Sequence, residues 1–300
     1  MRIVVLGAGA VGSWLGAVLA KAHDVTLVGR DPHMEVVRRA GIVVEDRSTI
    51  HARPNALTDV RQAPTPDLLL VTVKAYDTAP AADAARPIVG PATRVLTLQN
   101  GLGNAEALRA RFGDRVLAGV TSHGVTFVEP GRVRHAGSGY VRIGAPWGAP
   151  FDDVLDAFRG GGIEADRVDG VWGEIWAKVA VNVAINPATA ITGLPNGEML
   201  RAPGLAWVLE AAAEEAAAVA EAVGVTLPPD DLVVRAREVA QRTATNKSSM
   251  LQDVERGRRT EIDALCGEVV RLGREHAVPT PVNATLLALV KGIERTTIAG

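Results

Sequence analysis

The sequence of 300 residues has little of what marks several protein classes. It has one cysteine, Cys266, which cannot form an internal disulfide, so nothing indicates an oxidising compartment. Aromatic residues make up 4% of the chain, too few for a platform on which nucleic-acid bases stack. No apolar run reaches the roughly 18 residues that a membrane span requires, and early glycines interrupt any signal-peptide core. We therefore expect a cytoplasmic protein without a membrane partner.

Charge and histidine spacing exclude further classes. The chain has 32 basic and 34 acidic residues, so its formal net charge is −2, which argues against binding nucleic acid. A serine hydrolase elbow is not predicted, because Ser138 follows Ala136-Gly137 and the G-x-S-x-G pattern is incomplete. No metal is expected, because the six histidines lack the spacing of metal ligands; they are His23, His33, His51, His123, His135 and His276.

Short apolar runs alternate with helical patterns through the first half of the chain. Strands are predicted over 3–6, 25–28, 68–73, 94–98 and 116–120, with helices over 7–20 and 104–112. Strands that are apolar throughout and separated by helices are typical of a parallel sheet covered on both faces. Segments 125–128 and 140–143, with Pro130-Gly131 and Gly137-Ser138-Gly139 between them, are expected to add antiparallel strands at the far edge of the sheet.

The character of the sequence changes near residue 170. Beyond it, long helical patterns cover 205–223, 233–243 and 250–276, with proline-rich breaks between them. We predict an α/β fold with two domains: residues 1–170 form a Rossmann-type, doubly wound, mostly parallel sheet, and residues 171–300 form an all-α domain.

A glycine-rich turn lies between the first strand and the first helix. It matches G-x-G-x-x-G and consists of Gly7, Ala8, Gly9, Ala10, Val11 and Gly12. In this context the first glycine permits a tight turn, the second admits a pyrophosphate, and the third allows close packing of helix and strand. The helix N-terminus then offers unpaired N–H groups to phosphate. The turn predicts a dinucleotide site.

The residues after the strands indicate which nucleotide binds. Arg30 follows the second strand, where it could hold the 2′-phosphate of NADPH, whereas Asp31 could bind the ribose hydroxyls of NAD. NADPH (or NADP) is the cofactor we expect. Lys74 and Asn100 follow two further strands, at the edge where ligands of such sheets bind. Each also has a plain alternative: Lys74 as a surface lysine, and Asn100-Gly101 as an ordinary turn.

The segment 171–187 carries a narrow polar stripe. Lys178, Asn182 and Asn186 are spaced four residues apart, so a helix places them on one face, and every residue between them is apolar. A buried lysine beside amides suits the reduction of a ketone, since an ammonium can protonate the developing alkoxide. The alternative is a partly solvated helix face with an ordinary ion pair between Glu174 and Lys178.

Three more polar residues are candidates. Asn196 lies in a Pro-Asn-Gly turn. Ser249 could bind substrate or, with Gln252, form a helix capping box. Glu261 looks like surface charge when taken by itself.

Together these residues resemble the ketopantoate reductase (2-dehydropantoate 2-reductase) family of the 6-phosphogluconate-dehydrogenase-like superfamily. The resemblance covers nearly the whole chain. It rests on GAGAVG, Arg30, VKA at 73–75, QNG at 99–101, KVAVNVAINPATAITGLPNGE at 178–198 and SSMLQDVERGRRTEID at 248–263. The last two runs are the specific ones.

The resemblance implies a role for each matched residue. Lys178 corresponds to the general acid of the family, and Glu261 to an acidic group beside that lysine and the substrate hydroxyl. Four residues correspond to ligands of the ketoacid: Asn182, Asn186, Asn196 and Ser249. Lys74 and Asn100 correspond to residues on the nicotinamide side, and Arg30 to the contact with the NADP phosphate. The implied activity is the NADPH-dependent reduction of ketopantoate to pantoate in pantothenate biosynthesis.

Two other functions stay open. The protein could reduce another branched 2-ketoacid by the same lysine mechanism, or it could bind NADPH as a sensor without catalysis. Related β-hydroxyacid dehydrogenases carry a motif resembling APVSGG late in the first domain; the corresponding region here, 121–144, fits ketopantoate reductases better. The expected partner is a small 2-ketoacid, and the sequence leaves a homodimer open.

Overall fold

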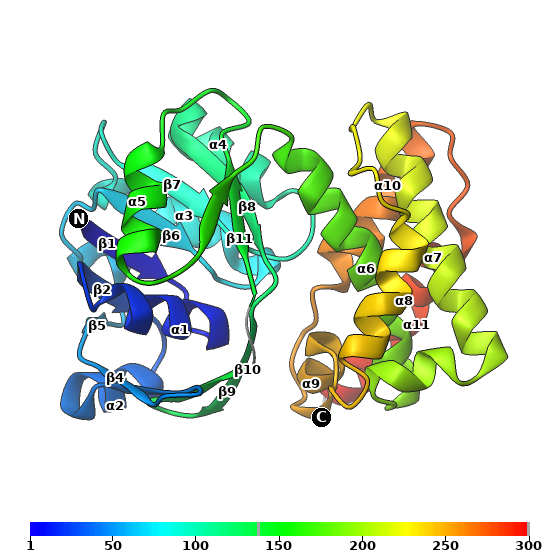
Figure 1. Cartoon of the computed structure of the whole chain (residues 1–300), viewed down its shortest axis with the longest axis horizontal. Coiled ribbons are helices and arrows are strands. Elements are labelled where there is room, and N and C mark those ends of the chain that lie inside the picture. The colour runs from blue at the N-terminus through cyan, green and yellow to red at the C-terminus, as the bar shows by residue number, and fades with distance from the viewer. Residues whose placement is uncertain (137–138, 299–300) are drawn as a thin grey trace. The chain divides into compact units, whose positions relative to one another are not determined.

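The computed structural model describes residues 1–136 and 139–298, and these form two compact units (Figure 1). The first comprises Met1–Gln99 and Asn104–Val171, and the second comprises Asn100–Gly103 and Trp172 onward. The short segment Asn100–Gly103 therefore belongs with the helical unit, although it lies within the first half of the sequence.

An eight-stranded sheet organises the first unit, in the order β12-β11-β8-β7-β6-β1-β2-β5. All neighbouring strands are parallel except β8 and β11, which run antiparallel. The mostly parallel α/β sheet predicted from the sequence is thus confirmed. The strands are β1 Arg2–Leu6, β2 Asp24–Val28, β5 Asn55–Leu57, β6 Leu68–Val71, β7 Arg94–Thr97, β8 Val116–Thr121, β11 Val141–Gly144 and β12 Ala165–Arg167.

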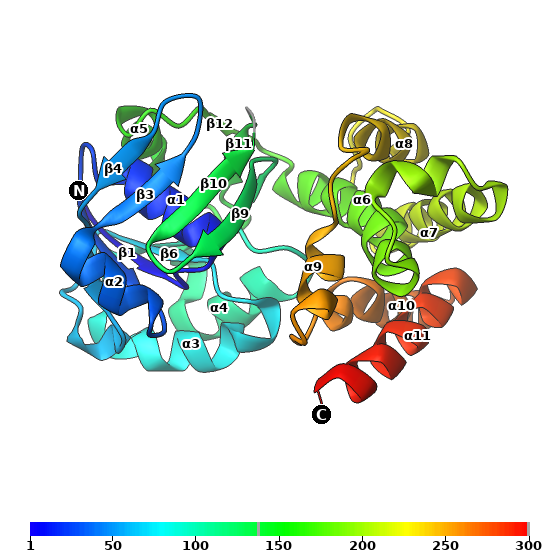
Figure 2. The same ribbon diagram turned by 90° about the horizontal axis from the view of Figure 1, so that it is seen from below.

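Helices cover both faces of this sheet, as Figure 2 shows for α1 and α5 on one side and α3 and α4 on the other. Along β1, Ile3 and Val5 join the core beneath α1, whereas Val4 and Leu6 join the core beneath α3 and α4. Alternate side chains thus point to opposite apolar cores, which explains why the strands read as unbroken apolar runs. The helices are α1 Ala10–Leu19, α2 His33–Ala40, α3 Thr78–Ala85, α4 Asn104–Phe112 and α5 Asp152–Gly160, with short 3₁₀ turns η1 Val60–Gln62, η2 Ala75–Asp77, η3 Arg86–Ile88 and η4 Gly113–Arg115.

A second sheet in this unit corrects one prediction. Strand β9 (Gly124–Glu129) does not extend the main sheet; it pairs antiparallel with β10 (Arg132–Ala136) in the order β4-β3-β10-β9. Strand β10 in turn pairs parallel with β3 (Ile42–Glu45), which pairs with β4 (Ile50–Ala52). Since this pairing joins segments about ninety residues apart, a local pattern could not reveal it. The other predicted segment, 140–143, corresponds to β11, which pairs antiparallel with β8 as expected, and the turn residues Gly137 and Ser138 lie outside the described residues.

The second unit is helical. It contains α6 Val171–Thr192 (whose first residue is counted with the first unit), α7 Pro203–Ala222, α8 Leu232–Arg242, α9 Ser249–Glu255, α10 Cys266–Glu275 and α11 Pro281–Ile298, with 3₁₀ turns η5 Asn196–Leu200 and η6 Ile262–Ala264. Its core is rich in alanine, and alanines of α7 at 212, 213, 216 and 220 are fully buried. Small side chains let the helices approach closely.

The helical segment predicted over 250–276 is interrupted in the structure. Helix α9 ends at Glu255 and α10 begins at Cys266, with Gly257 at φ +63° in the connection. A positive φ is costly for most residues but not for glycine, so Gly257 ends the helix there.

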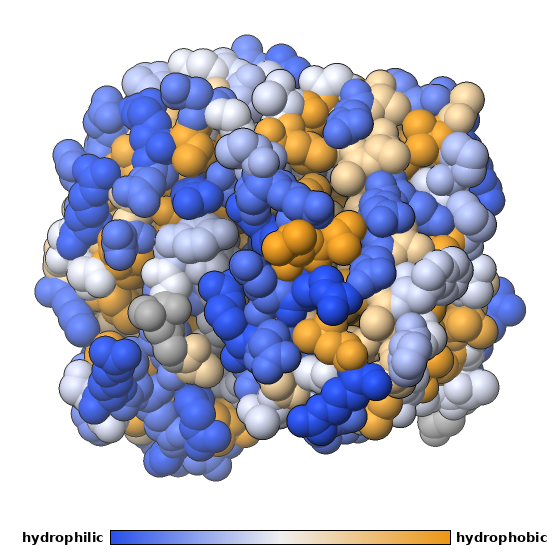
Figure 3. Space-filling model, turned by 45° about the vertical axis from the view of Figure 1, so that its right-hand side comes forward, coloured by the Kyte–Doolittle hydropathy of each residue, from blue (hydrophilic) through white to orange (hydrophobic). Residues whose placement is uncertain are grey.

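The surface mixes hydrophilic and hydrophobic residues. On the face drawn in Figure 3, hydrophobic residues form separate patches between hydrophilic ones. Within the described ranges, no helix combines the length and apolar character needed to cross a membrane.

Candidate active site

The glycine-rich turn has the geometry of a phosphate cradle. Gly7 has φ +112°, and a Cβ there would lie 2.5 Å from the Val73 nitrogen, so only glycine fits. A Cβ on Gly9, in contrast, would meet no atom within 4 Å. The space above Gly9 is therefore open to a ligand, and the first N–H groups of α1, which have no acceptor within the helix, follow directly. This turn fits a dinucleotide pyrophosphate.

The two charged residues after β2 have different partners. The Arg30 side chain is 89% exposed and forms an ion pair with Asp77 at 3.1 Å. The Asp31 carboxylate accepts a hydrogen bond from Arg38 of α2 at 3.2 Å. An exposed ion pair contributes little free energy, so Arg30 is readily available to a phosphate, whereas Asp31 is held toward α2.

Lys74 and Asn100 both follow parallel strands, as predicted, but fall in different units. Lys74 is the residue before η2, three positions beyond β6. Asn100 begins the segment that belongs to the helical unit. This segment is attached there by the Leu102 N–H, which donates to the Ala264 carbonyl at 2.8 Å. The backbones approach closely at Gly101 (φ +86°), where a Cβ would lie only 2.6 Å from the same carbonyl oxygen.

Gln99, which the sequence reasoning missed, anchors the other side of this connection. Its Nε2 donates to the Val73 carbonyl and to Thr78 Oγ1, both at 2.8 Å. The signal was present in the Gln-Asn-Gly motif, but the partners of Gln99 come from a neighbouring strand end.

Helix α6 contains the whole polar stripe. Lys178 and Asn182 are partly buried and Asn186 is 8% exposed, while the residues between them are buried. In the part of α6 from Lys178 to Asn186, only Lys178 and Asn182 are therefore more than slightly accessible. The helix continues through Pro187, so the stripe lies well inside it.

Burial and one neighbouring charge determine the protonation of Lys178. Burial lowers the pKa of Lys178 from 10.5 to about 8, because removal from water disfavours the ammonium, while the negative charge of Glu261 raises it. The structure thus brings Lys178 and Glu261 together, although they are 83 positions apart in sequence. Glu261 is 9% exposed, not a surface charge, and precedes η6.

Asn196 and Ser249 differ in their surroundings. Asn196 is 8% exposed at the start of η5, and its Nδ2 donates to Thr243 Oγ1 at 2.8 Å. Ser249 is exposed in the first turn of α9.

The capping box that was the alternative role of Ser249 with Gln252 is not formed. Ser248 caps α9 instead: its Oγ accepts from the Leu251 N–H at 3.1 Å and from Thr189 Oγ1 of α6 at 2.7 Å. The cap lies one residue earlier because Ser248, not Ser249, is buried against α6. This leaves the Ser249 side chain outside the cap.

Several of the histidines are hydrogen-bonded within the first unit. The Gly131 N–H donates to His33 Nδ1 at 2.8 Å, and burial lowers the pKa of His33 to about 4. His123 Nδ1 and His135 Nε2 lie 2.8 Å apart, and His135 Nδ1 lies 2.7 Å from Asp46. Over residues 1–136 and 139–298, no group of three or more His, Cys, Asp or Glu could hold a metal ion.

A parallel sheet with a phosphate cradle, followed by a helical unit with a buried lysine, defines the class of dehydrogenase-type reductases. Comparison with known proteins specifies the family. The family model described as "Ketopantoate reductase PanE/ApbA" matches residues 3–147, and that described as "Ketopantoate reductase PanE/ApbA C terminal" matches residues 171–294. The chain belongs to the ketopantoate reductase family.

Individual relatives agree with this assignment. A 2-dehydropantoate 2-reductase of Halobacterium salinarum is 45% identical over 304 residues, covering 98% of this chain and 99% of the relative. One from Archaeoglobus fulgidus is 39% identical, covering 98% of both chains. The crystal structure of a PanE/ApbA family ketopantoate reductase from Ralstonia eutropha matches with a TM-score of 0.94 at 37% identity, covering 99% of both chains. A D-mandelate dehydrogenase solved with NADH has a TM-score of 0.93 at 23% identity, covering 99% of both, and shares the fold.

Proposed function

We propose that this protein reduces ketopantoate to pantoate with NADPH, using Lys178 as the proton donor. The observation that carries the proposal is the placement of Lys178: it is partly buried on an apolar helix, burial lowers its pKa to about 8, and Glu261 is a neighbouring charge. A general acid works best when its pKa lies near the working pH. Membership of the ketopantoate reductase family supports ketopantoate as the substrate.

The chemistry that falls to the protein is proton delivery and charge stabilisation. When bound, NADPH supplies a hydride to the carbonyl carbon. The carbonyl oxygen then gains negative charge, which the Lys178 ammonium stabilises, and Nζ gives one proton to that oxygen. Glu261 keeps Lys178 protonated despite its burial. Because Lys178 ends the step neutral, it must take up a proton before the next turnover.

Amides and a hydroxyl are suited to hold the ketoacid. Asn182 and Asn186 extend the stripe by two turns from Lys178, and we assign them to the carboxylate and hydroxyl of the substrate. Asn196 and Ser249 are assigned to the same ligand. Amide and hydroxyl donors are uncharged, so they can bind the carboxylate of the substrate while Lys178 stays available to the carbonyl oxygen.

The first unit is assigned to the nucleotide and residues 171–300 to substrate and catalysis. Ala8, Ala10, Val11 and Gly12 complete the cradle of Gly7 and Gly9, while Lys74 and Asn100 are assigned to the nicotinamide side. Asn100 is assigned to the substrate as well. NADPH is favoured over NADH because the ion pair of Arg30 is exposed and because Asp31 is bonded to Arg38.

The test is a steady-state assay of nucleotide oxidation with ketopantoate, 2-ketoisovalerate, pyruvate and a 3-ketoacid, each with NADPH and with NADH. We expect ketopantoate with NADPH to have a kcat/KM orders of magnitude above every other pair. A higher kcat/KM for another 2-ketoacid would make that ketoacid the substrate and would leave the lysine mechanism unchanged. Tight NADPH binding without turnover of any ketoacid would instead indicate a sensor.

A further inference from the structure

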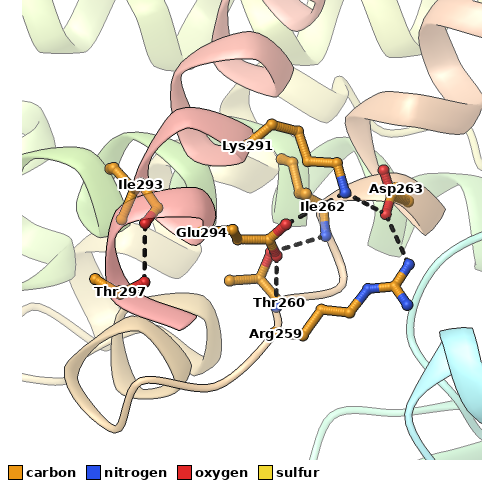
Figure 4. A network of polar contacts seen from close by, with 8 residues as sticks. All are labelled: Arg259, Thr260, Ile262, Asp263, Lys291, Ile293, Glu294 and Thr297. Carbon is orange, nitrogen blue, oxygen red and sulfur yellow. Dashed lines mark hydrogen bonds and ion pairs between the residues drawn. The ribbon is translucent and has the colours of Figure 1, made fainter. Parts of the chain in front are cut away.

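A buried carboxylate on α11 holds the turn that carries Glu261. Glu294 is 8% exposed, and its Oε1 accepts two hydrogen bonds from Thr260, one from the backbone N–H at 2.7 Å and one from Oγ1 at 2.8 Å (Figure 4). Both groups of Thr260 are buried. Thr260 directly precedes Glu261, so this pair of hydrogen bonds fixes the backbone at the residue before Glu261.

Thr260 also fixes the residue after the acid. Its Oγ1 accepts a hydrogen bond from the Ile262 N–H at 3.2 Å. The Glu261 carbonyl accepts from the N–H groups of Ala264 and Leu265 at 3.1 and 3.2 Å. The backbone around Glu261 is therefore bonded on both sides, and one hydroxyl joins the two halves of the turn.

Charged groups around Glu294 hold it in its bonding orientation. Lys291 Nζ donates to Glu294 Oε2 at 3.2 Å and to Asp263 at 2.7 Å, and Arg259 donates to the same Asp263 oxygen at 3.1 Å (Figure 4). Burial alone would lower the pKa of Lys291, but its bonds to Asp263 and Glu294 outweigh burial and raise it. Lys291 therefore remains a cation and occupies the second oxygen of Glu294, leaving the first for Thr260.

The same turn receives the segment that begins at Asn100. The Ala264 carbonyl, at the end of η6, accepts the Leu102 N–H at 2.8 Å. A shift of the turn would consequently move both Glu261 and the Asn100 segment.

We propose that Glu294, acting through Thr260, is a positioning residue for the reduction: it holds Glu261 where its charge acts on Lys178. The inference rests on the proposed function. It adds Glu294, on helix α11, to the residues that support the reaction of Lys178. Glu294 contacts neither Lys178 nor, in this proposal, the substrate. The charged groups to consider near Lys178 are Glu261, whose charge acts on it, and Glu174, one turn earlier on α6.

Substitutions at Thr260 and Glu294 test this inference. Thr260→Val removes the hydroxyl and keeps the shape, whereas Thr260→Ser retains both hydroxyl bonds. Glu294→Ala removes the acceptor of both Thr260 hydrogen bonds. Thr297→Val is a matched control, because the exposed Thr297 hydroxyl bonds only to the Ile293 carbonyl of its own helix in Figure 4.

The first readout needs no substrate: the pH dependence of Lys178 acetylation by dilute acetic anhydride, followed by mass spectrometry. We expect the pKa of Lys178 to fall by about one unit in Thr260→Val and Glu294→Ala, since the ammonium loses its neighbouring charge. Thr260→Ser and Thr297→Val should stay near the wild type. An unshifted value in Thr260→Val would overturn the inference, even if Glu294→Ala failed to fold.

The second readout is the kinetic profile with ketopantoate and NADPH. In Thr260→Val we expect kcat to fall about tenfold above pH 8 while the Kd of NADPH stays unchanged, with recovery in Thr260→Ser. Equal losses in Thr260→Val and Thr260→Ser would contradict positioning by the hydroxyl. If the wild type did not reduce ketopantoate, the labelling result would still decide the structural claim, so the two failures are distinguishable.

Discussion

The charge of Glu261 opposes the effect of burial on Lys178. Burial is the larger effect and brings the pKa of Lys178 to about 8. The lysine is therefore mostly protonated at neutral pH and loses its proton when the pH rises above about 8. Lys178 therefore combines two properties that a donor in each turnover needs: it is charged before the reaction and can be neutral after it.

The pH dependence of the reaction follows from this value. Reduction needs the ammonium, so kcat/KM for ketopantoate should be level below about pH 8 and fall about tenfold per unit above it. Oxidation of pantoate needs the neutral amine and should rise over the same range. Glu261→Gln removes the charge that raises the pKa of Lys178, so the fall in reduction and the rise in oxidation should both move to lower pH. An alkaline limb that stayed in place in Glu261→Gln would show that another group titrates.

The glycine turn offers a test in which fold and binding separate. Gly9→Val places its side chain in open space, so we expect an unchanged melting temperature and a Kd for NADPH at least tenfold higher, because the pyrophosphate approach is blocked. Gly7→Ala should instead destabilise the protein, since φ is +112° and Val73 lies too close. Calorimetry and fluorescence titration distinguish the two. Normal NADPH binding by Gly9→Val would exclude this turn as the phosphate site.

Arg30 should decide between the two nucleotides. Arg30→Ala removes a charge-assisted contact to the 2′-phosphate, so we expect the KM for NADPH to rise about 10- to 100-fold and that for NADH to stay unchanged. Arg38→Ala frees Asp31 to reach the ribose hydroxyls of NADH and should therefore lower the KM for NADH. Equal changes for both nucleotides in Arg30→Ala would assign Arg30 another role.

The adjacent serines of α9 should separate stability from substrate binding. Ser248→Ala removes the cap and the acceptor of Thr189, at a cost of about 1–2 kcal/mol in the free energy of unfolding. Ser249→Ala should leave stability unchanged and raise the KM for ketopantoate about tenfold, the effect of one lost hydrogen bond to a charged ligand. Urea unfolding and kinetics measure both; a normal KM in Ser249→Ala would remove Ser249 from the substrate site.

Features defined by neighbouring residues were predictable from the sequence. The glycine turn, the apolar strands of the main sheet and the polar stripe of α6 each depend on residues within a few turns or one strand. The parallel pairing of Val43 with Arg132 does not, so the second sheet was missed and β9 was assigned to the wrong one.

The same distinction divides the site. Lys178 could be found from the stripe, but Glu261 by itself looked like surface charge, because its local sequence does not reveal that the fold buries it. Thr260 and Glu294 had no local signal, since their bond spans 34 positions. The capping serine was missed by one residue because the pattern suited Ser249, whereas the neighbouring helix buries Ser248.

Lys178→Met tests the central claim most directly. Methionine keeps the unbranched shape and removes only the ammonium, so we expect kcat/KM for ketopantoate with NADPH to fall about 10²- to 10⁴-fold. The Kd of NADPH should be unchanged and the melting temperature no lower, because a buried charge is removed. A variant that is folded, binds NADPH and still reduces ketopantoate at more than about a third of the wild-type rate would contradict the assignment of Lys178 as the proton donor.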